Sequence, residues 1–191
     1  MLSFMGAFLY FAYGSNMLTE RLTASNRCPS AKPVGTAYAR GRKLDFTKQS
    51  KDLSGKATLA EAENSHQYGV LFEIDKSELP CLDREEGYGN GYERDDTFMV
   101  VRPDGERVAS VTYIASSPKA GLIPYDWYLA LIVAGANQHG LPAEQIKSLQ
   151  STAFECVDKN ARAITGRRNA MDALAEAGFD SIAGILNQDR L

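Results

Sequence analysis

The side chains that could carry out a reaction in this chain are its carboxylates. No Gly-x-Ser-x-Gly turn is present, and none of the three cysteines lies in a recognisable nucleophile motif. His66 and His139 are far apart and lack the spacing of metal ligands, so we expect no metal. Proton transfer by an aspartate or a glutamate remains. By residue type alone, Glu86 is no better a candidate than Glu85 or Asp83.

A second stretch with chemical potential is Gly14-Ser15-Asn16, which follows an apolar run and precedes a helical pattern over 17–22. The first backbone N–H groups of a helix have no intrahelical partner and lie at the positive end of its dipole, so they can hold an anion. Gly14 would let a ligand approach the backbone closely. The simpler alternative is that Ser15 or Asn16 only caps the helix.

The composition limits the kind of partner. With 191 residues and 44% hydrophobic content, the chain fits one domain with a real core. Its net charge of −3 provides no basic surface for nucleic acid or for an anionic membrane, so a small molecule is the expected partner. Three cysteines without a CxxC pair favour a reducing, cytoplasmic setting. The glycine-rich stretch 87–92 lacks the spacing of a phosphate loop and precedes a strand, which argues against a nucleotide site.

The elements that must position these residues are mostly strands in the first two thirds of the chain. Strands are predicted over 9–13, 34–40, 42–47, 56–62, 67–74, 92–101 and 107–115, with a break at Gly41 and a turn at Asn64-Ser65. Few helices interrupt them. This pattern favours a small α+β domain built on an antiparallel, partly closed β-barrel with flanking helices.

A short helix is predicted over 75–86, with Ser77 as its N-cap and Gly87 just past its end. Neighbouring residues on a helix point about 100° apart, so only one of Glu85 and Glu86 can face inward.

The later part of the chain is predicted to be helical. An amphipathic helix over 126–138 and a second over 142–150 are followed by helical pieces at 159–165 and 169–177, with Gly178 as a stop. We expect a catalytic domain over 1–156 and a helical extension over 157–191 packed on the same domain. The extension carries no catalytic pattern, and its helices suit packing or the contacts of a homodimer.

Two separated motifs together resemble a known family. Residues 11–16 with 18–21, and residues 82–87 about 70 positions later, look like the signature segments of the γ-glutamylcyclotransferases. The resemblance continues through 43–46, 68–72, Tyr128, 135–136 and 140–142. It therefore covers residues 8–150 and implies a small mixed fold around an antiparallel barrel.

The resemblance also implies a set of site residues and no cofactor. Glu86, directly before a glycine, matches the family's essential glutamate. The substrate-binding residues that it implies are Tyr13, Gly14, Ser15, Asn16, Tyr92 and Tyr128. The local spacing between Glu86 and Tyr92 differs by one residue from the family pattern, so Tyr88 is an alternative to Tyr92.

The reaction implied by the resemblance is internal cyclisation of a γ-glutamyl amide. The substrate's α-amine attacks its own γ-carbonyl, closes a five-membered lactam (5-oxoproline) and expels an amino acid or amine, with Glu86 moving the proton. Two alternatives stay open. The same chemistry could act on γ-glutamylamines, isopeptide-linked lysine or a γ-glutamyl-protected biosynthetic intermediate, or the protein could bind a small molecule without catalysis.

Overall fold

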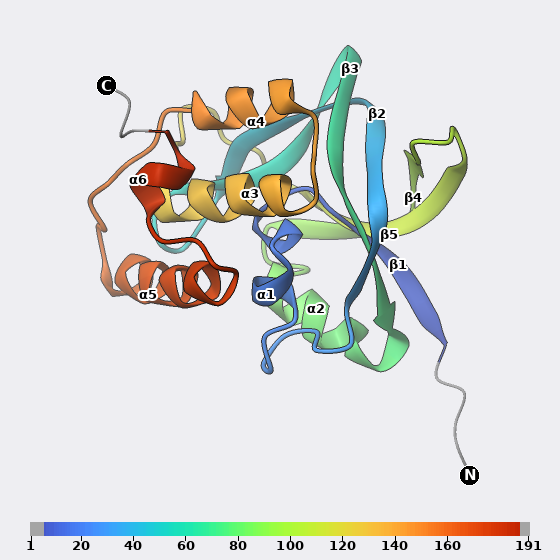
Figure 1. The fold of residues 1–191 in the computed structure, drawn as a ribbon, viewed down its shortest axis with the longest axis horizontal. Helices are drawn as coiled ribbons and strands as arrows, with labels where there is room; N and C mark the ends of the chain where they lie inside the picture. Colours follow the sequence, from blue (N-terminus) through green and yellow to red (C-terminus); the bar gives the residue numbers. More distant parts are fainter. Residues whose placement is uncertain (1–5, 188–191) are drawn as a thin grey trace.

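A computed structural model describes residues 6–187 as a closed five-stranded barrel with helices gathered mainly on one side (Figure 1). Around the barrel the strands follow the order β1-β3-β2-β4-β5. Their bounds are β1 Ala7–Ala12, β2 Lys32–Gln49, β3 Gly55–Asp75, β4 Tyr92–Val101 and β5 Arg107–Ala115. All pairs are antiparallel except β1 with β5, which meet in parallel at Tyr10 and Val111 and close the barrel. The predicted α+β barrel class is thus confirmed.

Strands β2 and β3 form one long ribbon, where the sequence pattern predicts four shorter strands. The predicted breaks are wrong because both lie within a single bulge of the ladder. Arg40 pairs with His66 and Arg42 pairs with Glu61, so residues 62–65 are accommodated opposite Gly41. Gly41 (φ 67°) absorbs the distortion, and pairing resumes on both sides. The β4–β5 hairpin, in contrast, has the predicted bounds.

The remaining elements are short turns and helices. They are the 3-10 turns η1 Ser15–Met17 and η2 Lys76–Glu78, and the helices α1 Thr19–Leu22, α2 Leu79–Glu86, α3 Asp126–Gln138, α4 Ala143–Gln150, α5 Ala161–Glu176 and α6 Ile182–Ile185. No helix among residues 6–187 is long and apolar enough to cross a membrane.

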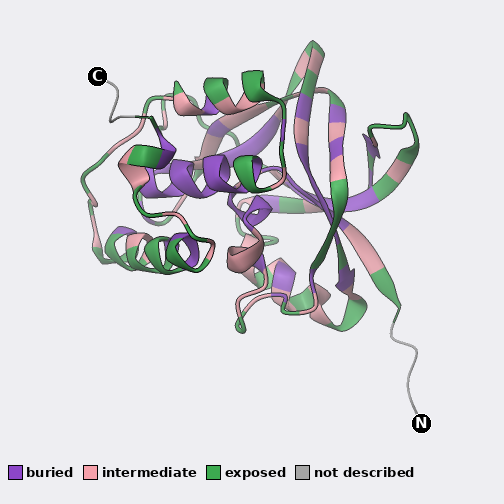
Figure 2. Cartoon of the chain, viewed as in Figure 1, coloured by how far each residue is buried: buried purple, intermediate pink, exposed green. Residues whose placement is uncertain are grey.

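Helix α3 is the centre of the helical layer. It has the predicted bounds, but the prediction that it is amphipathic is wrong, since every residue from Asp126 to Ala136 is buried (Figure 2). The helix contacts η1 on the barrel side and α4, α5 and α6 on the others. A helix enclosed in this way is apolar around most of its circumference.

The C-terminal extension contains helix α5, which runs unbroken where two pieces are predicted. Gly166, which falls between the two predicted pieces, lies under the Trp127 ring, and a Cβ there would be 2.6 Å from a ring atom. The glycine therefore serves close packing on α3 and leaves the helix intact. Gly178, with φ 82°, stands just past the end of α5, as predicted. Residues 1–5 and 188–191, at the outer ends of the two predicted segments, lie outside the described range.

Candidate active site

Seven residues that the sequence assigns to the site lie together in one pocket at the barrel. Glu86 ends α2, Tyr92 begins β4, Tyr128 belongs to α3, and residues 13–16 follow β1 directly. The complete lining is Tyr10, Tyr13, Gly14, Ser15, Asn16, Ala57, Glu86, Tyr92, Tyr113 and Tyr128. Five tyrosines and one carboxylate are thus drawn from β1 and the loop after it, α2, β4, β5 and α3.

Helix α2 determines which of the two neighbouring glutamates enters the pocket. Leu82 is buried, and Glu86 lies one turn later on the same face of the helix. Glu85 points to a different side, where its carboxylate pairs with Arg27 at 3.3 Å. Gly87 closes the helix in the left-handed region at φ 74°. The N-cap of the preceding turn is Asp75, whose carboxylate accepts from the Ser77 N–H, so the prediction of Ser77 as the cap is wrong.

The Glu86 carboxylate is held by two donors on one oxygen. The Tyr10 hydroxyl donates to Oε1 at 2.8 Å and the Asn16 amide donates to the same atom at 2.6 Å. Burial raises the pKa of Glu86 above its ordinary value, while the Tyr10 hydrogen bond, the nearby Arg27 and Arg21 charges and the Asn16 hydrogen bond lower it. The result is a fixed carboxyl group that binds a proton more readily than an exposed glutamate does.

The loop Gly14-Ser15-Asn16 does not cap a helix with its side chains. Neither η1 nor α1 has a side-chain cap, so the capping alternative is wrong. Ser15 Oγ instead accepts from Arg21 Nε at 3.2 Å, and Asn16 points at the carboxylate. Space at Gly14 is tight, because a Cβ there would lie 3.2 Å from the Ala57 Cβ. The loop therefore lines the pocket with the backbone of Gly14 and with the side-chain amide of Asn16.

Three tyrosine hydroxyls are occupied by backbone groups. Tyr13 donates to the Tyr113 carbonyl, Tyr92 donates to the Ala57 carbonyl, and Tyr128 accepts from the Ala57 N–H at 3.1 Å. Burial raises the pKa of all three hydroxyls, that of Tyr128 to about 12, so they stay protonated at neutral pH. Their rings form walls whose positions are fixed by the barrel strands.

Tyr92, and not its alternative Tyr88, lies in the pocket. Tyr92 is buried, whereas Tyr88 is 44% exposed and has the Arg94 guanidinium 5.2 Å from its ring centre. The difference follows from the turn after Gly87, which leaves Tyr88 outside the barrel and begins β4 at Tyr92.

Two lining tyrosines, Tyr10 and Tyr113, were missed by sequence reasoning. Tyr10 and Tyr13 are an odd number of positions apart, so a continuous strand would place them on opposite faces. The strand ends at Ala12, and the chain turns so that both reach the pocket. Tyr113 comes from β5, packs edge-on against Tyr10 at 6.1 Å and donates to Asp83 at 2.7 Å. No local pattern marks it.

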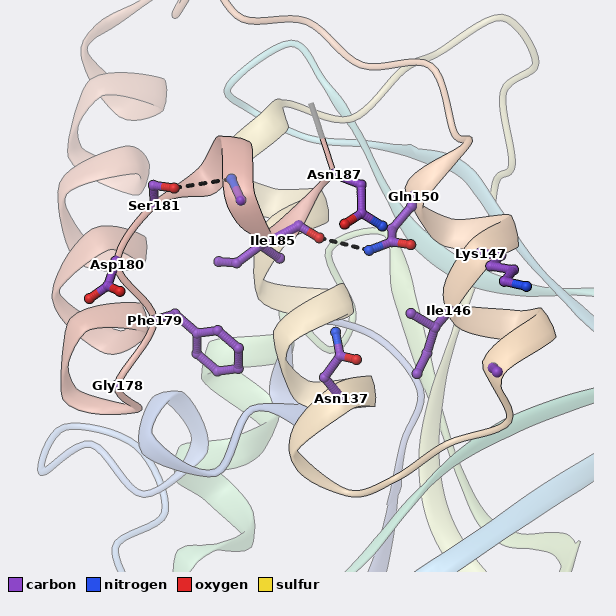
Figure 3. A pocket seen from close by; sticks show the side chains of 12 residues that line it. Asn137, Ile146, Lys147, Gln150, Gly178, Phe179, Asp180, Ser181, Ile185 and Asn187 are labelled. Carbon is purple, nitrogen blue, oxygen red and sulfur yellow. Dashed lines mark hydrogen bonds between the residues drawn. The ribbon is translucent and has the colours of Figure 1, made fainter. Parts of the chain in front are cut away.

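A wider hollow elsewhere in the molecule is less suited to chemistry. It lies between α3, α4 and α6 and is lined mainly by the C-terminal extension (Figure 3). Two of its polar side chains are engaged locally, since Gln150 donates to the Ile185 carbonyl at 2.9 Å and Ser181 accepts from the Gly184 N–H. We place the candidate site at Glu86 for this reason.

Comparison with known proteins gives a consistent result. A model of the AIG2-like family matches residues 66–149. A γ-glutamylcyclotransferase from Bos taurus is 35% identical over 150 residues, which cover 76% of this chain and 78% of that protein; the one from Homo sapiens is 33% identical with the same coverage. A solved structure of a γ-glutamyl cyclotransferase matches with a TM-score of 0.74 at 29% identity, covering 85% of this chain and 98% of that one.

The barrel and its helical layer define a small α+β domain, and the AIG2-like model matches part of it, residues 66–149. The mammalian relatives are similar over about three quarters of their own length, at 32–35% identity. The chain belongs to the γ-glutamylcyclotransferase family and is an enzyme of that type, which confirms the resemblance found in the two sequence motifs.

Proposed function

We propose that this protein converts γ-glutamyl amides to 5-oxoproline and releases the amino acid or amine that was bonded to the γ-carbonyl. The observation that carries the proposal is the Glu86 carboxylate, which is held on Oε1 by Tyr10 and Asn16 inside a tyrosine-walled pocket. The relatives named γ-glutamylcyclotransferase support the same reaction type.

The reaction needs a folded substrate more than a strong nucleophile. Its amine and its carbonyl belong to the same molecule, and well-oriented intramolecular partners reach effective concentrations of about 10⁵–10⁸ M, equivalent to about 7–11 kcal/mol of the barrier. A narrow pocket with rigid aromatic walls would select the conformer in which the α-amine faces the γ-carbonyl. The tyrosine rings supply such walls because their hydroxyls are tied to the backbone.

Glu86 would move the proton between the two nitrogens. Its Oε1 already accepts two hydrogen bonds, and within the described part of the chain no donor lies on Oε2. We assign the proton to Oε2. This atom takes a proton from the attacking amine as the C–N bond of the lactam forms, and returns it to the departing nitrogen as the amide bond breaks. The raised pKa of Glu86 brings the carboxyl closer to the value that suits both transfers.

The backbone of Gly14 to Asn16 would hold the γ-glutamyl end of the substrate. The first N–H groups of a helical turn have no acceptor within it, and Gly14, Ser15 and Asn16 all line the pocket. They suit the α-carboxylate of the glutamyl group or the oxyanion that develops on the γ-carbonyl. In this proposal Tyr13, Ser15, Tyr92 and Tyr128 complete the walls.

One assay tests the proposal against its alternatives. The protein is incubated with γ-glutamyl amino acids, γ-glutamylamines and ε-(γ-glutamyl)lysine, and 5-oxoproline and the released amine are measured by chromatography. We expect equal molar amounts of 5-oxoproline and amine from at least one substrate. Binding of these compounds without any 5-oxoproline would leave the non-catalytic binding protein and remove the proposal.

A further inference from the structure

Arg27 contacts the side chain of Asn16 but is not one of the residues that line the catalytic pocket. It belongs to the loop between α1 and β2, which lies beside α2 (Figure 1). The loop is tightly folded at this point. The Arg27 N–H donates to the Ala24 carbonyl at 2.8 Å, and the next residue, Cys28, is fully buried and donates to the Leu22 carbonyl at 3.0 Å. The base of the Arg27 side chain is therefore fixed next to the site.

The two ends of the Asn16 amide have different partners. Arg27 Nη1 donates to Asn16 Oδ1 at 3.4 Å, and Asn16 Nδ2 donates to Glu86 Oε1 at 2.6 Å. The contact with Arg27 is long for a hydrogen bond, so it acts mainly through the attraction between the guanidinium charge and the amide oxygen. A guanidinium can only donate and an ionised carboxylate can only accept, so both partners favour the same orientation of the amide.

The carboxylate alone does not fix this orientation throughout the proposed reaction. Once Glu86 has taken a proton from the substrate, its carboxyl group can donate as well as accept. A rotated Asn16 amide could then accept from a proton on Oε1, where that proton would be turned away from Oε2. The rotated amide would, however, direct its NH₂ group at the Arg27 guanidinium, and two donors would face each other without an acceptor. Arg27 therefore disfavours the rotated amide in both protonation states of Glu86.

The guanidinium of Arg27 also has a partner at its other end. Nη2 lies 3.3 Å from Glu85 Oε2. A planar guanidinium can contact Asn16 and Glu85 at the same time, which the single nitrogen of a lysine does not do in a fixed geometry. A glutamine at position 85 would still offer an acceptor oxygen, so Glu85→Gln leaves Arg27 with a partner.

We propose that Arg27 is a positioning residue of the reaction, which holds the Asn16 amide towards Glu86 Oε1 in both protonation states and so keeps the transferred proton on Oε2. This inference rests on the proposed function and concerns the same site. Arg27 acts on Glu86 through the Asn16 amide and, in addition, through its own charge. Burial raises the pKa of Glu86, and the Arg27 charge is among the groups that oppose this effect.

The test is a double-mutant cycle on kcat, with γ-glutamylalanine as the substrate and 5-oxoproline as the measured product. Arg27→Met should lower kcat about tenfold in the wild-type background, with KM changed less than about threefold. In the Asn16→Ala background the amide is already gone, so Arg27→Met should lower kcat less than about twofold. Thermal melting checks that each variant is folded. Arg27→Gln takes the place of Arg27→Met if methionine disturbs the loop, since both changes remove the cation.

Arg84→Met is the matched control. Arg84 is a second arginine beside Glu85, at 3.8 Å, but its side chain is 67% exposed and its hydrogen bond goes to Cys81. The variant removes the same charge from the same neighbourhood, and kcat should stay within about twofold of the wild type.

The pH profile separates positioning from a general loss of structure. Removal of the Arg27 charge should move the acidic limb of kcat/KM to higher pH by about 0.5 unit or more, and Arg27→Lys should return the limb to its wild-type position. A structural defect would lower kcat/KM equally at every pH. The other titratable groups that border Glu86 are unchanged in these variants, and they are Tyr10, Tyr13, Arg21, Lys48, Lys56, Glu85, Tyr92, Tyr113 and Tyr128.

Two results would overturn the role of Arg27 while cyclisation stands. Equal losses of kcat in the two backgrounds would show that Arg27 does not act through Asn16, and an unmoved acidic limb would show that it does not act on Glu86. Absence of 5-oxoproline from the wild type with every γ-glutamyl amide tested would overturn the cyclisation itself.

Discussion

Replacing Glu86 by glutamine tests whether the Glu86 carboxyl group carries the proton in the proposed reaction. The change keeps the shape of the side chain, and the amide oxygen can still accept from Tyr10 and Asn16 as Oε1 does. What it removes is the proton-carrying position at Oε2. We therefore expect a folded protein that still binds γ-glutamyl ligands and does not turn them over.

The magnitude follows from the number of proton transfers that one group performs. General acid–base catalysis by a positioned side chain contributes about 10²–10⁴-fold, and here the same carboxyl would serve both the attacking and the departing nitrogen. A fall in kcat of about 10³-fold or more is expected, with KM changed less than about threefold.

Although Glu86→Gln should lower kcat, it should raise the stability of the folded protein. Because burial raises the pKa of Glu86, the folded state prefers the protonated carboxyl, and its ionisation lowers stability as the pH rises above the unfolded value of about 4.3. Glutamine has no such ionisation. The melting temperature of Glu86→Gln should therefore rise relative to the wild type between pH 4 and pH 8.

The assay combines 5-oxoproline release with thermal melting at several pH values, and Glu85→Gln is the control. Glu85 is the neighbouring glutamate of the same helix, but its partners are Arg27 and the exposed Arg84. Its replacement should change kcat by less than about threefold. If Glu86→Gln keeps more than a tenth of the wild-type kcat, or if Glu85→Gln loses as much, Glu86 is not the proton carrier.

Three further outcomes are expected. Asn16→Ala removes a donor that favours the charged form of Glu86, so the acidic limb of the kcat/KM profile should move to higher pH; an unmoved limb would make Asn16 a packing residue. Gly14→Val should raise KM for all γ-glutamyl substrates alike, and a loss confined to one amine would contradict the assignment of this loop to the glutamyl end. Arg167→Met leaves two partly buried aspartates unpaired and should lower the free energy of unfolding in urea by about 2–4 kcal/mol, where a change below about 0.5 kcal/mol would show that the pairs contribute nothing.

The sequence was most informative where local signals and the tertiary structure agree. The strands of the β4–β5 hairpin are connected through turn residues at 103–105 and have the predicted ends. Helix α3 also has its predicted ends. Errors arose where a residue that often ends a strand or helix lies inside a continuous element of the structure. Gly41 and Asn64 lie within one bulge of the β2–β3 ribbon, and Gly166 makes room for the ring of Trp127.

The sequence likewise indicated only part of the candidate site. The motifs indicated the loop and Glu86 through the family resemblance, whereas residue types alone did not distinguish Glu86 from Glu85. Tyr113 could not be found in this way, because barrel closure brings it to the pocket from β5, about 100 residues after the loop that it joins there. Such residues become visible only when the register of the strands is known.

The position of β1 in the barrel has a consequence for how the protein is made. This strand precedes its partners in the chain, since Ala7–Ala12 pairs with Val70–Asp75 and Tyr10 meets Val111 in β5. During synthesis, β1 must remain unpaired until β3 has emerged, and the barrel cannot close until β5 follows. Contacts so distant in sequence slow folding and leave apolar strands exposed to aggregation in the meantime. We expect refolding from denaturant to be slow and its yield to fall with protein concentration, even though the finished barrel encloses its core.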